Sequence, residues 1–152
     1  MVEIVPAEER DIRAVAYQMR LMDQLEVYLS HRHEPGEALF HAEQSSLWTR
    51  AARDRRGVFA VFGLAESKDD PGLASPWMLG TDRVKEHATA MIRLGREWLA
   101  DMLATHERLA NYVYSGNMDS RRWLERIGFT IEPEPTPYGT FLTDFHLFWA
   151  RR

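Results

Sequence analysis

The sequence of 152 residues contains no cysteine. Disulfide bonds, thiolate catalysis and cysteine-based zinc sites are therefore excluded, and the absence of cysteine is typical of a reducing compartment. No apolar run approaches the roughly 18 residues that span a bilayer, and residues 1–10 lack the basic start and apolar core of a signal peptide. Blocks of basic residues are also missing, and the net charge is −4. We therefore expect no membrane span and no direct nucleic-acid binding.

What the sequence does contain is typical of one globular domain. Hydrophobic residues make up 45% of the chain and charged residues 28%, a balance that excludes disorder. A chain of this length can bury most of its apolar surface without covalent cross-links. Because no internal repeat or linker divides the sequence, we expect a single domain over residues 1–152.

The most informative segment is residues 109–129, LANYVYSGNMDSRRWLERIGF. Alternating aromatic and β-branched residues predict a strand over Leu109–Tyr114. Asn117 is placed to cap the following helix, and Gly128 to end it. Phe129 then opens another strand. The apolar stripe of the predicted helix consists of Trp123, Leu124 and Ile127.

The remaining chain predicts a mixed sheet with helices on both faces. Further strands are expected at residues 2–5, 47–52, 58–64, 75–79 and 141–150, and further helices from near Pro6 to Met19 and at residues 22–28, 37–45 and 85–106. The nearly continuous apolar run at 58–64 predicts a strand buried on both faces. We expect a polar loop over Ser30–Gly36, and the prolines between Pro133 and Gly139 to interrupt any regular element until Phe141. A helix between later strands requires a parallel crossover.

A cluster of histidines and acidic residues lies in the expected loop: His31, His33, Glu34 and Glu37. The i, i+2 spacing of the two histidines is poor for metal ligation, and no further ligand is fixed nearby. We therefore predict a solvated loop and no metal site.

Three stretches together resemble the GNAT superfamily of N-acetyltransferases. They are Phe59–Leu64, Ser75-Pro76-Trp77-Met78-Leu79-Gly80-Thr81-Asp82, and Asn117-x-x-Ser120-x-x-Trp123-Leu124-x-x-x-Gly128-Phe129. They are similar in particular to short GNAT-like proteins of tailed bacteriophages and prophages, related to the internal virion protein A of short-tailed phages. The resemblance spans nearly the full chain. It implies a GNAT-like, mostly antiparallel mixed sheet of six to seven strands flanked by helices.

The resemblance also implies acetyl-CoA as the cofactor. GNAT enzymes hold the coenzyme pyrophosphate on backbone N–H groups of a glycine-rich loop at a helix N-terminus, and the matching segment here is Gly80–His87. Within it only Gly80 lacks a side chain, and Asp82 and Glu86 would repel a phosphate. The cofactor-binding residues implied are Met78, Leu79, Gly80, Arg83, Lys85 and Asn117.

The catalytic candidates are fewer. Many GNAT enzymes place a tyrosine beside the coenzyme sulfur as general acid, and the matching position here is Leu124. Tyr112 or Tyr114 would have to substitute, and we take Tyr114 as the candidate acid. No acidic residue lies in the strand 75–79, so Glu26 and His87 are the candidate bases for the amine.

Two functions follow from the resemblance. The first is a phage or prophage protein, present in the virion or its assembly, whose acetyltransferase chemistry is degenerate or lost. Its partners would be phage structural proteins or a second copy, in the host cytoplasm or the virion. The second is an active acyl-CoA-dependent N-acetyltransferase that modifies a phage or host protein amine. The departures at Gly80–His87 and Leu124 favour the first.

Overall fold

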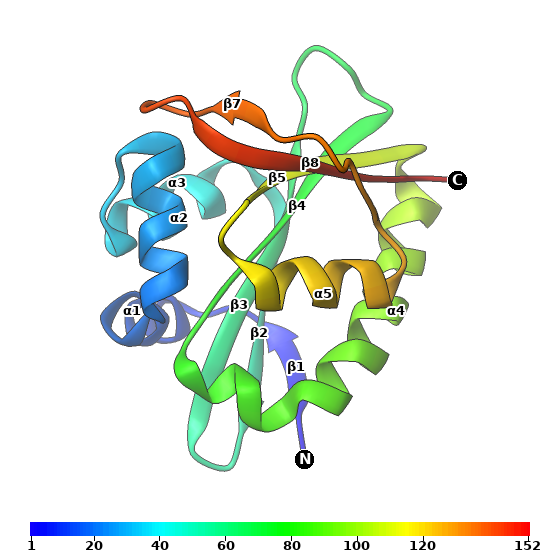
Figure 1. The fold of residues 1–152 in the computed structure, drawn as a ribbon. Coiled ribbons are helices and arrows are strands. Elements are labelled where there is room, and N and C mark those ends of the chain that lie inside the picture. Colours follow the sequence, from blue (N-terminus) through cyan, green and yellow to red (C-terminus); the bar gives the residue numbers. More distant parts are fainter.

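A computed structural model describes residues 1–152 and shows an eight-stranded mixed sheet with helices on both faces (Figure 1). The strands are β1 (Glu3–Pro6), β2 (Ser46–Asp54), β3 (Gly57–Glu66), β4 (Leu73–Gly80), β5 (Arg108–Tyr114), β6 (Thr130–Ile131), β7 (Thr136–Tyr138) and β8 (Thr143–Arg151). The helices are α1 (Glu9–Gln18), α2 (Leu21–His31), α3 (Pro35–Gln44), the 3₁₀ helix η1 (Asp82–His87), α4 (Ala88–Thr105) and α5 (Met118–Ile127). The predicted fold class is confirmed.

The strand order is β1-β2-β3-β4-β5-β8-β6, and β7 also pairs with β8. Every pairing is antiparallel except that of β4 with β5, which is parallel and covers only two residue pairs, Leu73 with Arg108 and Ala74 with Leu109. Beyond these pairs the two strands separate. The expected parallel crossover is therefore the β4–α4–β5 connection, and it ends in a splayed sheet.

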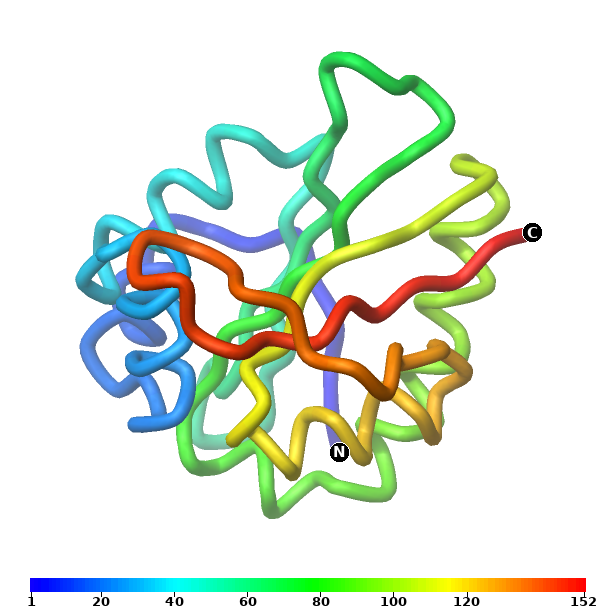
Figure 2. Tube along the Cα trace, turned by 45° about the horizontal axis from the view of Figure 1, so that its top comes forward, coloured from blue at the N-terminus to red at the C-terminus, as the bar shows by residue number.

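Two hydrophobic cores lie on opposite faces of the sheet. Helices α1 to α3 lie on one side and α4 and α5 on the other, as both ribbon and tube views show (Figures 1 and 2). The strand β3 serves both cores, because Phe62 belongs to the core under α4 and α5 whereas Val61 belongs to the core under α1 and α3. The predicted burial of this strand on both faces is confirmed.

Local sequence signals explain the α5 unit. The Asn117 side chain accepts a hydrogen bond from the Ser120 N–H at 3.3 Å, which is the predicted cap. Gly128 adopts a φ of 122°, a conformation that favours glycine, and the helix ends there. Both predicted helix boundaries are confirmed.

Four local predictions need correction. The polar loop at 30–36 shortens to residues 32–34, because α2 continues to His31 and Pro35 starts α3 at a position where its missing N–H costs nothing. The proline-containing segment forms β7, since Pro137 lies on an edge strand that leaves its nitrogen unpaired. With β6 and β7 counted, the sheet has eight strands rather than six to seven.

The fourth correction concerns the helix expected from Lys85. Its first part is the 3₁₀ helix η1, and α-helical geometry begins only at Ala88. The Thr81 side chain caps η1 by accepting from the Arg83 N–H, and the Asp54 carboxylate at the end of β2 holds both Arg83 and His87. These contacts fix the segment in a tighter coil. None of the helices combines the length and the hydropathy that crossing a membrane requires.

Candidate functional site

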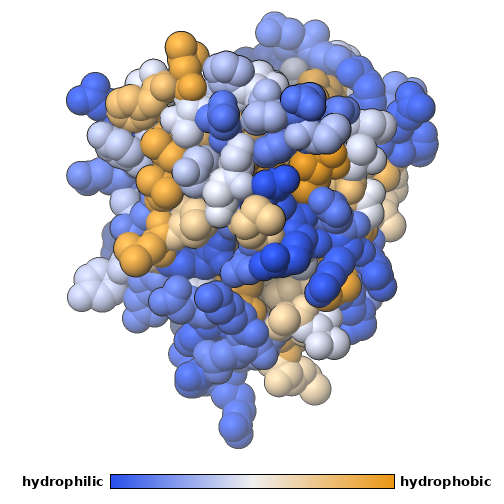
Figure 3. All heavy atoms as spheres, viewed as in Figure 1, coloured by the Kyte–Doolittle hydropathy of each residue, from blue (hydrophilic) through white to orange (hydrophobic).

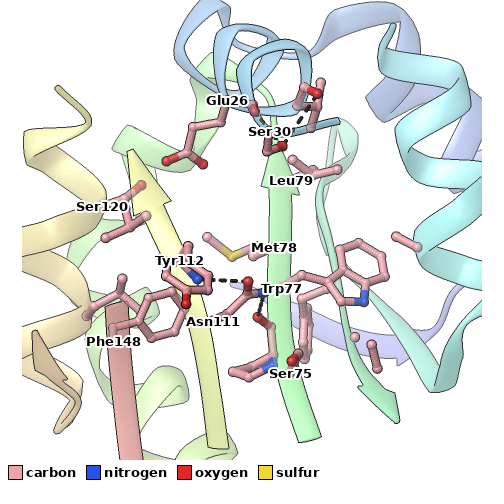
Figure 4. A pocket seen from close by; sticks show the side chains of 18 of the residues that line it. Glu26, Ser30, Ser75, Trp77, Met78, Leu79, Asn111, Tyr112, Ser120 and Phe148 are labelled. Atoms are coloured by element: carbon pink, nitrogen blue, oxygen red, sulfur yellow. Dashed lines mark hydrogen bonds between the residues drawn. The ribbon is translucent and has the colours of Figure 1, made fainter. Parts of the chain in front are cut away.

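The site begins at the splay between β4 and β5. Where the backbone pairing stops, the Asn111 side chain spans the gap and donates a hydrogen bond to the Pro76 carbonyl at 2.9 Å (Figure 4). Its own amide oxygen accepts from the Tyr112 N–H at 2.8 Å. Farther along, the side chain of Met78 lies between the two strands (Figure 4). The Asn111 side chain thus takes the place of one backbone hydrogen bond between β4 and β5 and spaces the two strands at this point.

The splay also exposes a backbone donor. Pro76 directs its carbonyl toward β5, and Gly80 donates its N–H to Asp23 on α2 rather than to β3. Because alternate residues of a strand direct their polar groups to the same side, the N–H of Met78 faces the splay as well. It is a preformed hydrogen-bond donor at the point where the strands diverge.

A cavity of about 440 Å³, here called the apolar cavity, passes through the splay. It is lined by α2 and α3 on one face of the sheet and by α4 and α5 on the other. Aromatic side chains form much of its lining on the first face: Trp77, Tyr112, Tyr138 and Phe145. The lining residues with acidic or basic side chains are Glu26, His31, His33 and His41.

A second space of about 450 Å³, here called the charged cleft, lies between η1, the start of α4 and α5. Its charged lining residues are Arg20, Asp23, Lys85, Asp119, Arg122 and Arg126. Arg20 and Arg122 are paired with Asp23 and Asp119, whereas Lys85 and Arg126 form no salt bridge. The cleft therefore carries uncompensated positive charge.

The two spaces meet at shared lining residues, which are Met78, Ser120 and Trp123. Glu26, on α2, points toward this junction (Figure 4). One of its carboxylate oxygens accepts hydrogen bonds from the Tyr114 N–H at 2.8 Å and from the Asn117 amide at 3.1 Å. Burial raises the pKa of Glu26 to about 7, although these two hydrogen bonds oppose the shift. A carboxyl group that titrates near neutral pH thus lies at the meeting point.

No protein-family model matches the sequence, and no curated protein matches it. Solved structures do match over nearly the whole chain. Spermidine N-acetyltransferase from Vibrio cholerae, in complex with CoA and spermine, has a TM-score of 0.71 at 12% identity and covers 99% of this chain and 95% of that one.

Two further structures agree. The yncA protein from Salmonella typhimurium, solved with its cofactor acetyl-CoA, has a TM-score of 0.70 at 14% identity, covering 99% of this chain and 93% of that one. An acetyltransferase of the GNAT family from Streptococcus pneumoniae has a TM-score of 0.61 at 16% identity and covers 100% of both chains. This chain has the GNAT fold. At these identities the likeness establishes the fold and no particular reaction.

The structure brings five of the predicted residues to the two spaces of the GNAT fold. Glu26 and Leu79 line the apolar cavity, Gly80 and Lys85 line the charged cleft, and Met78 lines both. Gly80 is also fixed against α2, since its N–H donates to Asp23 at 2.8 Å and its carbonyl accepts from the Arg20 N–H. A side chain at this position would collide with Val84. Burial raises the pKa of Asp23, and Arg20 opposes that shift.

Two other predicted residues lie behind the site. Asn117 is buried and lines neither space, and it acts on the site by holding Glu26. Tyr114 also lines neither space, because its ring packs against Phe145 at a centroid distance of 5.6 Å. Its backbone N–H, rather than its hydroxyl, contacts the junction through Glu26.

Arg83 and His87 are not brought to the site. Both side chains bind the Asp54 carboxylate, His87 through Nε2 at 2.8 Å, and His87 stacks on Phe59 at 4.4 Å. Hydrogen bonds from His87, Arg83 and a backbone N–H outweigh the effect of burial and lower the pKa of Asp54. The prediction of His87 as a base and Arg83 as a phosphate ligand finds no support in this placement, because both side chains bind Asp54 and so anchor η1.

The sequence interpretation missed Arg20 and Asp23, which contact the Gly80 segment from α2. No local pattern marks them, since their importance depends on α2 lying across the end of β4. Trp77 packs against the core under α1 and α3, and it also lines the apolar cavity. Tyr138 was expected in an irregular segment, but β7 places it against Tyr112.

Proposed function

We propose that this protein is an acyl-CoA-dependent N-acyltransferase that uses acetyl-CoA as donor and a primary amine as acceptor. The observation that carries the proposal is the position of Glu26 at the junction of the apolar cavity and the charged cleft. With a pKa of about 7, this carboxylate can take a proton from an attacking amine near neutral pH. The position corresponds to a catalytic base between a donor site and an acceptor site.

The donor would occupy the charged cleft. Phosphate groups bind guanidinium and ammonium side chains, and Lys85, Arg122 and Arg126 line the cleft. Because the Gly80 N–H already donates to Asp23, these side chains would supply the binding that a glycine-rich loop supplies in other GNAT enzymes. Lys85 keeps its predicted role, and Arg126 takes the place expected of Arg83.

The reaction would be a direct attack of the amine on the thioester carbonyl. The Met78 N–H faces the splay and would stabilise the negative charge that develops on the carbonyl oxygen. Glu26 would accept the proton that the amine loses. Leu124 is buried and has no proton to donate. We therefore assign the general acid to Tyr112, because Tyr112 lines the apolar cavity and Tyr114 does not.

Calorimetric titration with acetyl-CoA, followed by an assay of amine-dependent thiol release, tests this function. The sequence has no cysteine, so a thiol reagent detects released coenzyme without background from the protein. Micromolar binding together with amine-dependent release supports the proposal. Absence of heat at millimolar acetyl-CoA contradicts it.

A second candidate function is a structural protein of a phage particle or its assembly, as the resemblance to phage and prophage GNAT-like proteins implies. Two observations favour it. The Gly80 N–H already donates to Asp23 and is not free to bind a phosphate. Leu124 stands at the position where many GNAT enzymes have the tyrosine that acts as general acid. Apolar side chains also gather over α1, α2 and the β7–β8 turn (Figure 3). The most exposed of them are Tyr17, Leu21 and Leu142.

In this second function the exposed apolar side chains would contact phage structural proteins or another copy of the chain in the host cytoplasm or the virion. Purification of particles from infected cells distinguishes the candidates. A fixed number of copies per particle, with no acetyl-CoA binding, favours the structural role. Absence from particles together with coenzyme binding favours the enzyme.

A further inference from the structure

We infer that the acceptor is a small primary monoamine with an aromatic body, which the apolar cavity selects. This inference rests on the proposed function and names its substrate class. It depends on two features of the cavity: the shape of its aromatic walls and the scarcity of negative charge inside it.

The aromatic walls come from different parts of the chain and are held in place. Tyr138 of β7 stacks on Tyr112 of β5 with ring centroids 4.1 Å apart and an angle of 18° between the planes. Phe145 packs edge-on against Tyr138 at 5.2 Å. Across the cavity the Trp77 indole donates to the Ser46 hydroxyl at 2.8 Å, which fixes its orientation. Fixed rings on opposite sides form a slot suited to a flat apolar group.

The position of β7 is itself secured by contact with α2. Gly139, with a φ of 78°, approaches Ser30 so closely that a side chain there would meet its backbone at 2.6 Å. The Thr140 N–H donates to the Ser30 carbonyl, and Phe141 stacks on Tyr28 at 5.2 Å. The Tyr138 wall is therefore part of the folded structure rather than a free loop.

The charges of the cavity permit one ammonium group. Glu26 is the only carboxylate in its lining. The other titratable side chains are three histidines that stack on one another toward the solvent: His31 on His33 at 5.6 Å, and His33 on His41 at 4.7 Å. A second ammonium group on the same acceptor would lose water without gaining a carboxylate, which is costly in an apolar site.

The reaction joins an ammonium acceptor to acetyl-CoA and releases one proton. Glu26 first takes a proton from the ammonium group and passes it to solvent. The neutral nitrogen then forms a bond to the acetyl carbonyl carbon as the carbon–sulfur bond breaks. The nitrogen gives its next proton to Glu26, and the leaving thiolate takes one from Tyr112, which is reprotonated from solvent as Glu26 releases its own. The products are an N-acetyl amine, which has lost its positive charge, and free CoA.

Thiol release with acetyl-CoA is the first test, using phenethylamine, spermidine and a short lysine peptide as acceptors. We expect kcat/KM for phenethylamine to exceed that for spermidine and for the peptide by about tenfold or more, the effect of one unpaired charge in an apolar site. Equal or better use of spermidine or of the peptide overturns the inference and leaves the proposed function standing.

Direct calorimetric titration with phenethylamine separates this inference from the proposed function, because it needs no acetyl-CoA. We expect saturable binding that Tyr138→Ala weakens and Tyr138→Phe retains, while spermidine binds more weakly than phenethylamine. Absence of phenethylamine binding, or equal binding of the two amines, overturns the inference even where no transfer occurs.

A variant that adds negative charge provides the reverse test. His41→Asp places a carboxylate at the open end of the cavity, where the side chain is exposed, and should raise the ratio of spermidine to phenethylamine use by several fold. His41→Asn is the matched neutral control and should leave that ratio near the wild-type value. An equal ratio in the two variants counts against selection by charge.

Discussion

The charged cleft and the apolar cavity are nearly equal in volume, about 450 and 440 Å³, and opposite in chemistry. The cleft is lined by flexible cationic side chains from η1 and α5, whereas the cavity is walled by aromatic rings held by stacking and hydrogen bonds. They meet only around Met78, Ser120 and Trp123. One break in a sheet can therefore keep a polyanionic donor and an apolar acceptor in separate surroundings and bring their reactive ends together.

The largest effect is expected at the junction. Glu26→Gln removes the group that accepts the amine proton, and transfer should slow by about 10²–10⁴-fold. Amine binding should weaken as well, because Glu26 is the only carboxylate of the apolar cavity, while the binding of acetyl-CoA changes little. Steady-state thiol release and calorimetry measure these quantities. Glu66→Gln, an exposed change at the end of β3, is the matched control and should behave as wild type. A Glu26→Gln protein of full activity would show that the junction holds no base.

The next effect is on the free energy of unfolding, and it depends on Glu26 at the junction. Because the folded protein raises the pKa of Glu26 from its ordinary 4.5 to about 7, its stabilising contribution is complete below pH 4.5. That contribution is lost as the pH rises through 7, a loss of at most about 3 kcal/mol. Urea unfolding of wild type and Glu26→Gln between pH 4.5 and 8 measures it. The wild type should lose stability relative to the variant over this range, and parallel curves would argue for an unperturbed carboxylate.

A smaller effect is expected in the charged cleft. Reversing both unpaired cations, in Lys85→Glu with Arg126→Glu, should weaken acetyl-CoA binding by about tenfold or more, since each charge contributes on the order of 1 kcal/mol to binding a phosphate. Phenethylamine binding should not change, because neither residue lines the apolar cavity. Lys68→Glu with Arg55→Glu, two exposed positions outside both spaces, changes the net charge by the same amount and is the control. An equal loss of acetyl-CoA affinity in the control would show that the charged cleft is not the donor site.

The smallest effect is expected at Asn117. Replacing this residue by alanine removes the α5 cap and one hydrogen bond to Glu26, and should cost about 1 kcal/mol of unfolding free energy. That hydrogen bond lowers the pKa of Glu26, so its loss should also move the midpoint of the pH–rate profile to higher pH. Glu125→Ala, at an exposed position of the same helix that lines neither space, should leave the midpoint unchanged. An unchanged midpoint in Asn117→Ala would show that Asn117 caps α5 without influencing the pKa of the catalytic base.

The sequence predicts the parts of this fold that depend on neighbouring residues. The strand Leu109–Tyr114, the Asn117 cap and the helix end at Gly128 follow from alternation, capping and glycine geometry, and each is present. Glu26 was named as a base candidate only for lack of an acid in the strand 75–79.

The parts that could not be predicted depend on contacts between distant residues. Arg83 and His87 fall in the segment that should bind phosphate, but Asp54 lies 29 and 33 positions earlier and binds both. The raised pKa of Glu26 requires α2 to bury it against β5 and α5. Tyr138 becomes a cavity wall only because Gly139 lets β7 approach α2. Contacts between residues so far apart in the chain leave no short sequence pattern from which they could be predicted.

The bridge from Asn111 to Pro76 has a mechanical consequence. At the Leu73 end the edge between β4 and β5 is closed, because two backbone pairs join the strands there and the Arg108 N–H donates to the Gly72 carbonyl. Beyond the Asn111 bridge no backbone pair joins the two strands. A narrow group can therefore lie between β4 and β5 near Met78 without breaking a hydrogen bond of the sheet.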